Sequence, residues 1–271
     1  MGKRVRVVGL LLVVALVGGA IFVANASAER PEFGRCLKQA TKSLSNFDNA
    51  KCVKLASEDT GNEEEKLKKG NYQWFSGVVK AKFTTKLKEG TLVTLESVAG
   101  TKIVCTGETS SGEYTGPKTV GGVLIVFKGC EVGGNKCNST GRATGEVATA
   151  TLEGLLGVEK VGTNTPLNDT LAIELHAPAG QNFVEFTCGG LLSEVVRGSV
   201  LHKVAANAMK LTITEKFVAS KGIQKPDHFA FGAPGEHILE LSNSGSPFEQ
   251  LGLSLATILS NEEKVEASTV N

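Results

Sequence analysis

The clearest pattern in this sequence is an alternation of apolar and polar residues with a period of two. Leu211 and Ile213, for example, alternate with Thr212 and Thr214. This alternation is typical of a strand with one buried face and one solvated face. Further strand candidates are Thr91–Ser97, Lys102–Thr106, Val123–Lys128, Gly145–Glu153, Thr170–His176, Asn182–Cys188, Val195–Lys203, Leu253–Leu259 and Lys264–Ser268.

Turn-forming residues separate these strand candidates, and no long helical pattern lies between them. The separators are Gly121-Gly122, Gly133-Gly134-Asn135, Ala177-Pro178-Ala179-Gly180 and Ser242–Pro247. Many short strands without helices predict an all-β fold, either an antiparallel β-sandwich or an open barrel. We expect this fold over residues 76–271. Gly162–Asp169 is the one plausible internal linker, so the pattern leaves open whether this region forms one sandwich or two.

The first 28 residues have the three-part layout of an export signal. Met1–Arg6 is short and basic, Val7–Ala24 carries no charge, and Ala26-Ser27-Ala28 is an A-x-A cleavage site. This layout predicts a secretory signal peptide over residues 1–28 and an exported chain that begins at Glu29. The alternative is an uncleaved anchor, because an apolar run of this length could span a bilayer. After cleavage we expect no membrane segment.

Residues 29–75 differ in composition from the rest of the chain. A helix-like stretch lies near Arg35–Ser43, and a charge-rich run covers Asn62–Lys69. Charge runs of this kind are usually solvated faces. We therefore expect a short N-terminal segment, tied by a disulfide, ahead of the β domain.

All six cysteines lie beyond the predicted signal, where an oxidising environment favours disulfides. Six cysteines allow 15 pairings. Spacing favours a local Cys36–Cys52 bridge and a Cys130–Cys137 bridge across the Gly133-Gly134-Asn135 turn, which leaves Cys105 to pair with Cys188. A zinc site is the alternative, but no C-x-x-C or H-x₃₋₅-H spacing appears. We expect no metal and no cofactor.

The charge balance argues against a nucleic-acid partner. The whole chain has 29 Lys and Arg against 28 Asp and Glu, and Lys3, Arg4 and Arg6 belong to the predicted signal. The exported part is therefore close to neutral, whereas electrostatic nucleic-acid binders concentrate basic residues on one face. The hydrophobic content of 41% also excludes disorder as the main state.

Several short phrases, taken in their order along the chain, resemble a family of secreted actinobacterial proteins. They are Pro31-Glu32-Phe33-Gly34-Arg35-Cys36, Tyr72-Gln73-Trp74-Phe75-Ser76-Gly77, Ile103-Val104-Cys105-Thr106-Gly107-Glu108, Gly112-Glu113-Tyr114-Thr115-Gly116, Gly129-Cys130-Glu131, Phe186-Thr187-Cys188-Gly189 and Val196-Arg197-Gly198-Ser199. The resemblance covers the chain from Pro31 to about Ser199. It implies secretion and cysteines placed for disulfides. That family has no assigned activity, so the resemblance carries over no catalytic residue.

The usual catalytic motifs are missing from the sequence. There is no G-x-S-x-G, H-E-x-x-H, phosphate-binding loop or dinucleotide fingerprint. One constellation is of interest, because residues 177–181 resemble a hairpin turn that would bring Glu174 and His176 onto one face with Glu185. Two carboxylates at the right separation could hydrolyse a glycosidic bond. The favoured interpretation is the solvated side of a hairpin, so we predict no catalytic residue.

Tyr72, Trp74 and Phe75 form the densest aromatic group. If they are exposed, they could stack on a sugar or bind a partner. The scarcity of aromatic residues, 6% of the chain, favours packing instead.

Two functions remain open on the sequence alone. The first is a non-catalytic, disulfide-stabilised secreted protein that binds an extracellular partner or an envelope component. The second is a secreted carbohydrate-active hydrolase that uses Glu174 and Glu185. A concave pocket lined by both carboxylates would favour the hydrolase, whereas a flat exposed sheet would favour the binding protein.

Overall fold

The computed structural model describes residues 31–40, 45–56, 70–78, 80–163, 165–231 and 236–269. These residues form antiparallel strands, and the one helical element among them is a single 3₁₀ turn, η2 (Pro166–Asn168). The predicted all-β antiparallel class is therefore confirmed.

Most of the strands line up end to end, so that they form eight long strands. For instance, β3 (Lys82–Leu87) and β4 (Val93–Ser97) both pair antiparallel with β18 (Glu249–Ser268), one after the other along its length, and so form one long strand. The other long strands are β5–β6 (Lys102–Cys105, Gly107–Tyr114), β7–β8 (Thr119–Lys128, Glu131–Val132), β9–β10–β11 (Asn135–Asn138, Val147–Ala148, Leu152–Lys160), β12–β13 (Thr170–His176, Val184–Cys188), β14 (Leu192–Val204) and β15 with β17 (Lys210–Ser220, Leu239–Asn243).

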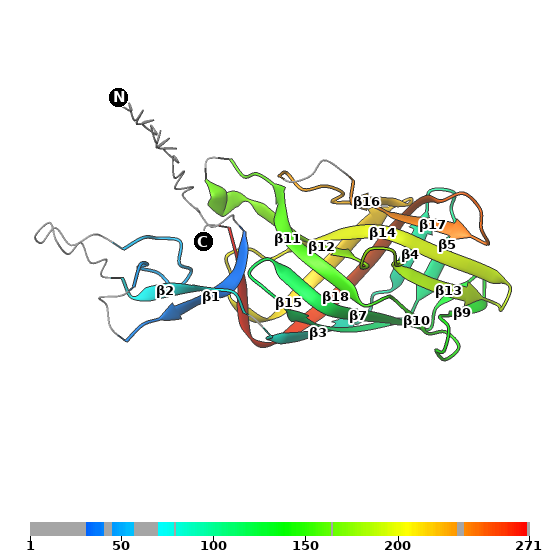
Figure 1. The fold of residues 1–271 in the computed structure, drawn as a ribbon, viewed down its shortest axis with the longest axis horizontal. Helices are drawn as coiled ribbons and strands as arrows, with labels where there is room; N and C mark the ends of the chain where they lie inside the picture. Colours follow the sequence, from blue (N-terminus) through cyan, green and yellow to red (C-terminus); the bar gives the residue numbers. More distant parts are fainter. Residues whose placement is uncertain are drawn as a thin grey trace, which may run out of the picture.

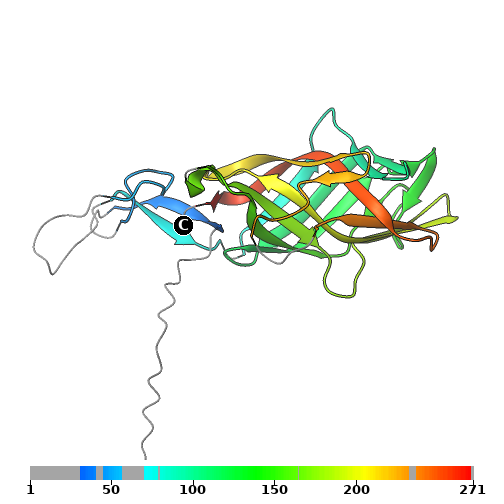
Figure 2. The same cartoon turned by 90° about the horizontal axis from the view of Figure 1, so that it is seen from above.

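Each long strand pairs with the next one along the chain, and the last pairs with the first. The closing contacts place Leu259 of β18 opposite Thr85 of β3, and Leu253 opposite Leu95 of β4. These pairings make the sheet an eight-stranded up-and-down barrel that closes on itself. Figures 1 and 2 show the arrangement of the strands. An antiparallel barrel of eight strands encloses an interior that side chains can fill, with room left for at most a small ligand.

One excursion interrupts the regular meander. Between β15 and β17 the chain forms a short hairpin with β16 (Ile223–Lys225) and then reaches β11, where the Ala230 N–H donates to the Val158 carbonyl. In β14, Gly198 has a φ of +96°, and a Cβ atom there would lie 2.1 Å from the carbonyl oxygen of Ile238. Only glycine allows so close an approach. The stretch 162–169, considered above as a linker, joins β11 to β12, and these two strands pair with each other in antiparallel fashion, with one register shift between Val158 and Lys160.

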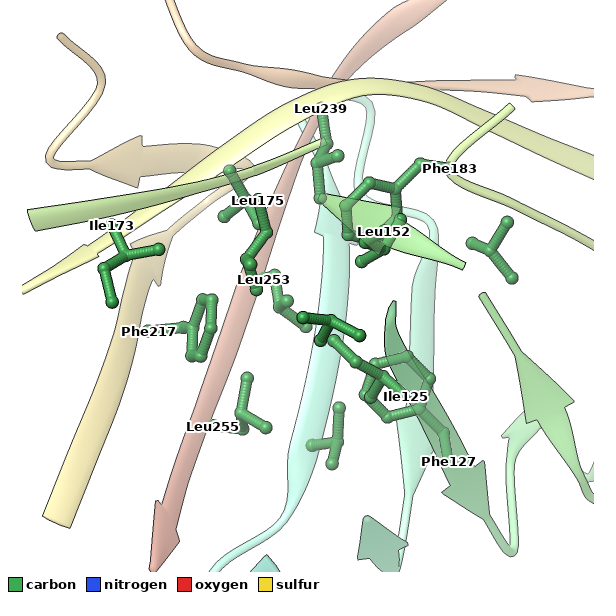
Figure 3. Packing of buried hydrophobic residues seen from close by; sticks show 14 of the residues in the cluster. Ile125, Phe127, Leu152, Ile173, Leu175, Phe183, Phe217, Leu239, Leu253 and Leu255 are labelled. Atoms are coloured by element: carbon green, nitrogen blue, oxygen red, sulfur yellow. The ribbon is translucent and has the colours of Figure 1, made fainter. Parts of the chain in front are cut away.

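The hydrophobic core fills the inside of the barrel. Inward residues alternate with outward ones along each strand, and the alternation in β13 and β4 is uninterrupted. Figure 3 shows side chains from different walls pointing toward one another, among them Phe217, Leu253, Leu255, Ile173 and Leu175. The apolar residues of each alternating strand therefore face the interior of one closed barrel, and most of the polar residues face its outside.

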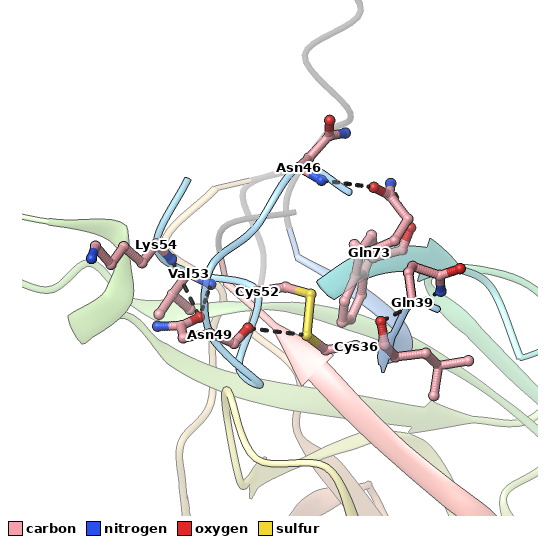
Figure 4. The surroundings of a disulfide bond; sticks show 10 residues. Cys36, Gln39, Asn46, Asn49, Cys52, Val53, Lys54 and Gln73 are labelled. Carbon is pink, nitrogen blue, oxygen red and sulfur yellow. Dashed lines mark hydrogen bonds between the residues drawn. A yellow bond between two sulfur atoms is a disulfide. The ribbon is translucent and has the colours of Figure 1, made fainter. Parts of the chain in front are cut away.

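The N-terminal segment lies at one end of the barrel (Figures 1 and 2). Its β1 (Glu32–Lys38) pairs with β2 (Tyr72–Ser76) on one side and with the end of β18 on the other. The helix expected from Arg35 onward is wrong over Arg35–Lys38, because pairing with β2 holds this backbone extended. The expected Cys36–Cys52 bridge is present (Figure 4), and Asn49 Oδ1 accepts hydrogen bonds from the backbone N–H groups of residues 53 and 54 beside it.

The other two predicted bridges are wrong. The structure pairs Cys105 with Cys130 and Cys137 with Cys188. The β8–β9 hairpin forms as predicted, but it lies between β5 and β13. Cys130 therefore lies next to Cys105 of β5, and Cys137 lies next to Cys188 of β13. The order of the strands around the barrel, which spacing along the chain does not reveal, decides the pairing.

Two sequence predictions fall outside the described residues: the signal peptide over 1–28 and the charged run over 62–69. In the part of the chain that the structure describes, no helix has the length and apolar character needed to cross a membrane. Three disulfides indicate folding in an oxidising environment.

Candidate functional site

A cavity remains inside the half of the barrel that is nearest to the N-terminal segment. Its free volume is about 60 Å³. A buried water needs roughly 10–15 Å³ by this kind of measure, so the cavity has room for a few waters or a very small ligand. Strands β3, β6, β7, β12, β14, β15 and β18 contribute its lining, and Phe33 of β1 completes it.

One wall of this cavity is apolar. It consists of side chains from β7 and β12 that face inward by strand alternation, including Val123, Ile125 and Leu175. All three are at least 90% buried. This wall would offer dispersion contacts to the carbon skeleton of a ligand but no hydrogen bond.

The opposite wall is polar, and it begins on β6 and β3. Glu108 is buried, and its Oε1 accepts a hydrogen bond of 2.5 Å from Thr85 Oγ1. The Thr85 hydroxyl also lies 2.7 Å from Ser110 Oγ. The second oxygen of Glu108, Oε2, is buried without a hydrogen-bond partner. Half of this carboxyl group is therefore free to bind something else.

The polar wall continues on β14, β15 and β18. His202 Nε2 lies 3.5 Å from Glu215 Oε1, and the imidazole stacks on the Phe217 ring with centroids 4.4 Å apart. Thr257 is directly opposite Glu215 in the pairing of β15 with β18. Both ring nitrogens of His202 and the hydroxyl of Thr257 are buried without a hydrogen-bond partner. Each such unsatisfied group costs about 1–3 kcal/mol of stability.

The electrostatics of the polar wall favour positive charge. Burial, with a smaller contribution from the neighbouring Glu215, raises the pKa of Glu108 to about 7, although the Thr85 hydrogen bond opposes the shift. The pKa of Tyr114 is raised as well, because the phenol is buried and Glu215 repels a second negative charge. Glu215 lies beside the imidazole, and its negative charge also acts on Glu108, so a cation would be favoured near the two carboxyl groups.

Phe33 closes the cavity on the side of the N-terminal segment. Its ring is 3% exposed and meets the edge of Tyr114, with centroids 4.9 Å apart. Tyr114 is fixed in turn by a 3.0 Å hydrogen bond from its hydroxyl to Asn261 Oδ1. The backbone N–H of Phe33 donates to the carbonyl of Pro117 in the β6–β7 turn. The N-terminal strand therefore acts as a plug in the barrel mouth.

The structure does not assemble the carboxylate pair suggested by the sequence. β12 and β13 do not form a hairpin; they lie end to end along β14. Glu174 Oε1 lies 2.9 Å from His237 Nδ1 and 3.7 Å from His176 Nδ1. Glu185 accepts a hydrogen bond from Asn182 and lines a different surface hollow. The geometric premise of the hydrolase hypothesis is therefore wrong.

The aromatic group on β2 is partly packed against the protein and partly exposed to solvent. Trp74 packs against Gly34, where a Cβ atom would lie 2.4 Å from the indole ring, and Tyr72 is half-buried. Phe75, by contrast, is 43% exposed. A ligand-binding role for these three residues stays a prediction.

Comparison of the chain with protein-family models, curated proteins and solved structures returns no match. The resemblance to secreted actinobacterial proteins stays a prediction. Among the described residues, no group of three or more His, Cys, Asp and Glu side chains is arranged to hold a metal ion.

The sequence predictions missed the whole polar wall. Glu108 belongs to β6, whose residues Gly107–Tyr114 have too few apolar side chains to be recognised as a strand. Glu215 and His202 each interrupt the apolar phase of their strands, next to Phe217 and Val200. A charged or imidazole side chain in the buried phase of a strand is the signal that could have revealed them.

Proposed function

We propose that this protein is a secreted, non-catalytic binding protein that holds a small molecule inside its barrel. The observation that carries the proposal is the interior cavity, in which buried polar atoms of Glu108, His202 and Thr257 lack partners. Buried polar groups are normally satisfied, and unsatisfied ones facing a cavity are suited to a ligand. The apolar wall opposite them would hold the rest of the molecule.

Secretion is supported by two independent features. Three disulfides and no free cysteine among the described residues fit an oxidising compartment. The residues before Glu29 have the layout of an export signal. Binding to an extracellular partner or envelope component stays a prediction of the sequence.

The geometry does not favour a hydrolase that acts on polysaccharides. The buried carboxyl groups lie behind the barrel wall and the Phe33 plug, where a polymer cannot reach them. Glu174 and Glu185, which are nearer the surface, line no common hollow among those described.

The proposal can be tested with 1-butanol as a neutral probe, followed by NMR chemical shifts of the exported chain. We expect saturable shifts at residues of the cavity wall. Val123→Phe should abolish them by filling the cavity, whereas Leu124→Phe, on the outward face of the same strand, should not. Native mass spectrometry of the purified protein should in addition detect any small molecule that co-purifies.

Two outcomes would contradict the proposal. One is an absence of saturable binding in the wild type both for 1-butanol and for charged molecules of the same size. The other is binding that persists in a folded Val123→Phe protein, because the probe would then lie outside the barrel.

A further inference from the structure

The cavity has two chemically different walls, and this difference constrains the ligand. Polar side chains come from β3, β6, β14, β15 and β18, whereas β7 and β12 contribute only apolar ones. A molecule that satisfies both walls has an apolar body and a single polar head. The free volume of about 60 Å³ limits it to a few heavy atoms while Phe33 remains in place.

The unpartnered atoms of the polar wall are one oxygen of Glu108, both ring nitrogens of His202 and the hydroxyl of Thr257, and the strongest acceptors on this wall are its two carboxyl groups. Glu108 has one oxygen satisfied by Thr85 and one without a partner. Glu215 lies 3.5 Å from a His202 nitrogen that makes no hydrogen bond. A carboxylate accepts hydrogen bonds and does not donate them. A head group with several N–H donors would therefore use this wall better than a hydroxyl or a carboxylate would.

The charge of the site points to the same head group. The titratable side chains on the cavity wall are Glu108, Glu215, His202 and Tyr114. The charge of Glu215 disfavours the ionised form of Glu108, and a cation between the two groups would offset that repulsion. An anionic head group would add to it. His202 is the one basic side chain on this wall, and it is already beside Glu215.

We infer, on the basis of the proposed binding function, that the ligand class is a small aliphatic amine bound as its ammonium ion. The ammonium donates to the carboxylates of Glu108 and Glu215 and to the hydroxyl of Thr257. Its alkyl part packs against Val123, Ile125 and Leu175. An ammonium has three N–H donors, and charge-assisted hydrogen bonds to carboxylates are about twice as strong as neutral ones.

The test compares three probes of nearly equal size at pH 7: n-butylamine, 1-butanol and butyrate. Isothermal titration calorimetry or NMR titration of the exported chain measures each affinity. We expect n-butylamine to bind at least about tenfold more tightly than 1-butanol, because its hydrogen bonds are charge-assisted. Butyrate should show no saturable binding. Because Glu108 has a pKa of about 7 and is partly protonated at pH 7, binding of the ammonium should favour its ionised form and release protons.

Variants locate the head group. Glu108→Gln and Glu215→Gln should each weaken n-butylamine by about tenfold or more and leave 1-butanol within about threefold. Glu113→Gln, on the same strand as Glu108 but lining an outer hollow, is the matched control and should change neither affinity. Thermal unfolding confirms that each variant is folded. Thr257→Val supplies a second test should either acidic variant fail to fold.

The outcomes separate the two proposals. Equal affinity for amine and alcohol would overturn the amine inference and leave the binding function intact. Amine binding unchanged in folded Glu108→Gln and Glu215→Gln proteins would also overturn it, because the ammonium would then lie elsewhere. If none of the three probes binds, the cavity holds only water and both proposals are rejected.

Discussion

Burial of Glu108 makes the stability of the barrel depend on pH in an unusual direction. The folded protein raises the pKa of this carboxyl group from 4.5 to about 7. Below pH 4.5 both the folded and the unfolded states hold the proton. Between pH 4.5 and 7 the unfolded chain releases it and the folded chain retains it. Glu108 therefore contributes most stability at low pH, and this contribution is lost as the pH rises from 4.5 through 7.

The size of the effect follows from the shift. One pKa unit corresponds to 1.36 kcal/mol, so a rise from 4.5 to about 7 corresponds to about 3 kcal/mol between pH 4.5 and pH 8. Glu108 is 4% exposed, so solvent does little to screen this contribution. Gln has no ionisable proton and can still accept the hydrogen bond from Thr85. Between pH 4.5 and pH 8, the free energy of unfolding of Glu108→Gln should therefore rise by about 3 kcal/mol relative to that of the wild type.

Urea unfolding followed by circular dichroism, with disulfides intact, measures both proteins at several pH values. Glu215, His202 and Tyr114 remain in both, so the difference between the two curves reports Glu108. Burial also raises the pKa of Glu266 to about 7, and Glu266→Gln should produce a comparable but separate change. A difference between Glu108→Gln and the wild type that does not vary with pH would refute the reasoning.

Four further perturbations test other parts of the fold. Replacing Cys137 and Cys188 by Ala should cost about 4 kcal/mol in denaturant unfolding, against about 3 kcal/mol for Cys36 and Cys52, because the loops span 51 and 16 residues. Phe33→Ala should cost about 3–5 kcal/mol and speed the release of a bound probe, as measured by NMR exchange. Gly198→Ala should cost more than about 2 kcal/mol in the same unfolding assay, since both its φ and the Ile238 carbonyl oppose a Cβ atom. Glu174→Gln should cost about 1 kcal/mol through its partly buried contact with His237, whereas exposed Glu185→Gln should stay within about 0.5 kcal/mol.

Local patterns in the sequence predicted individual strands well but not their neighbours. The bounds predicted for Thr170–His176 coincide with those of β12, because apolar alternation and the flanking turn residues act within one strand. Pairing depends instead on contacts between distant parts of the chain. For this reason the sequence predicts a hairpin at Ala177–Gln181 and a disulfide between the two cysteines that flank the β8–β9 turn, whereas the structure has neither.

The candidate site was missed for a related reason. Hydrophobic periodicity identifies strands by an apolar inner face, but β6 directs Glu108 and Ser110 into the barrel. The residues that make the cavity chemically distinctive are thus the ones that remove the strand signal. Only the closed ring, in which β6 lies between β3 and β7, shows that these polar side chains face inward.

The closing strand also governs the order in which the molecule can fold. β18 joins the first long strand to the seventh, and its final residues pair with β1. Until residues 249–268 have been synthesised, the other seven long strands can form only an open sheet with two unpaired edges. Such edges readily recruit strands from other chains, and contacts between distant segments form slowly. A nascent or truncated chain that lacks β18 would therefore be the species most in need of protection from aggregation.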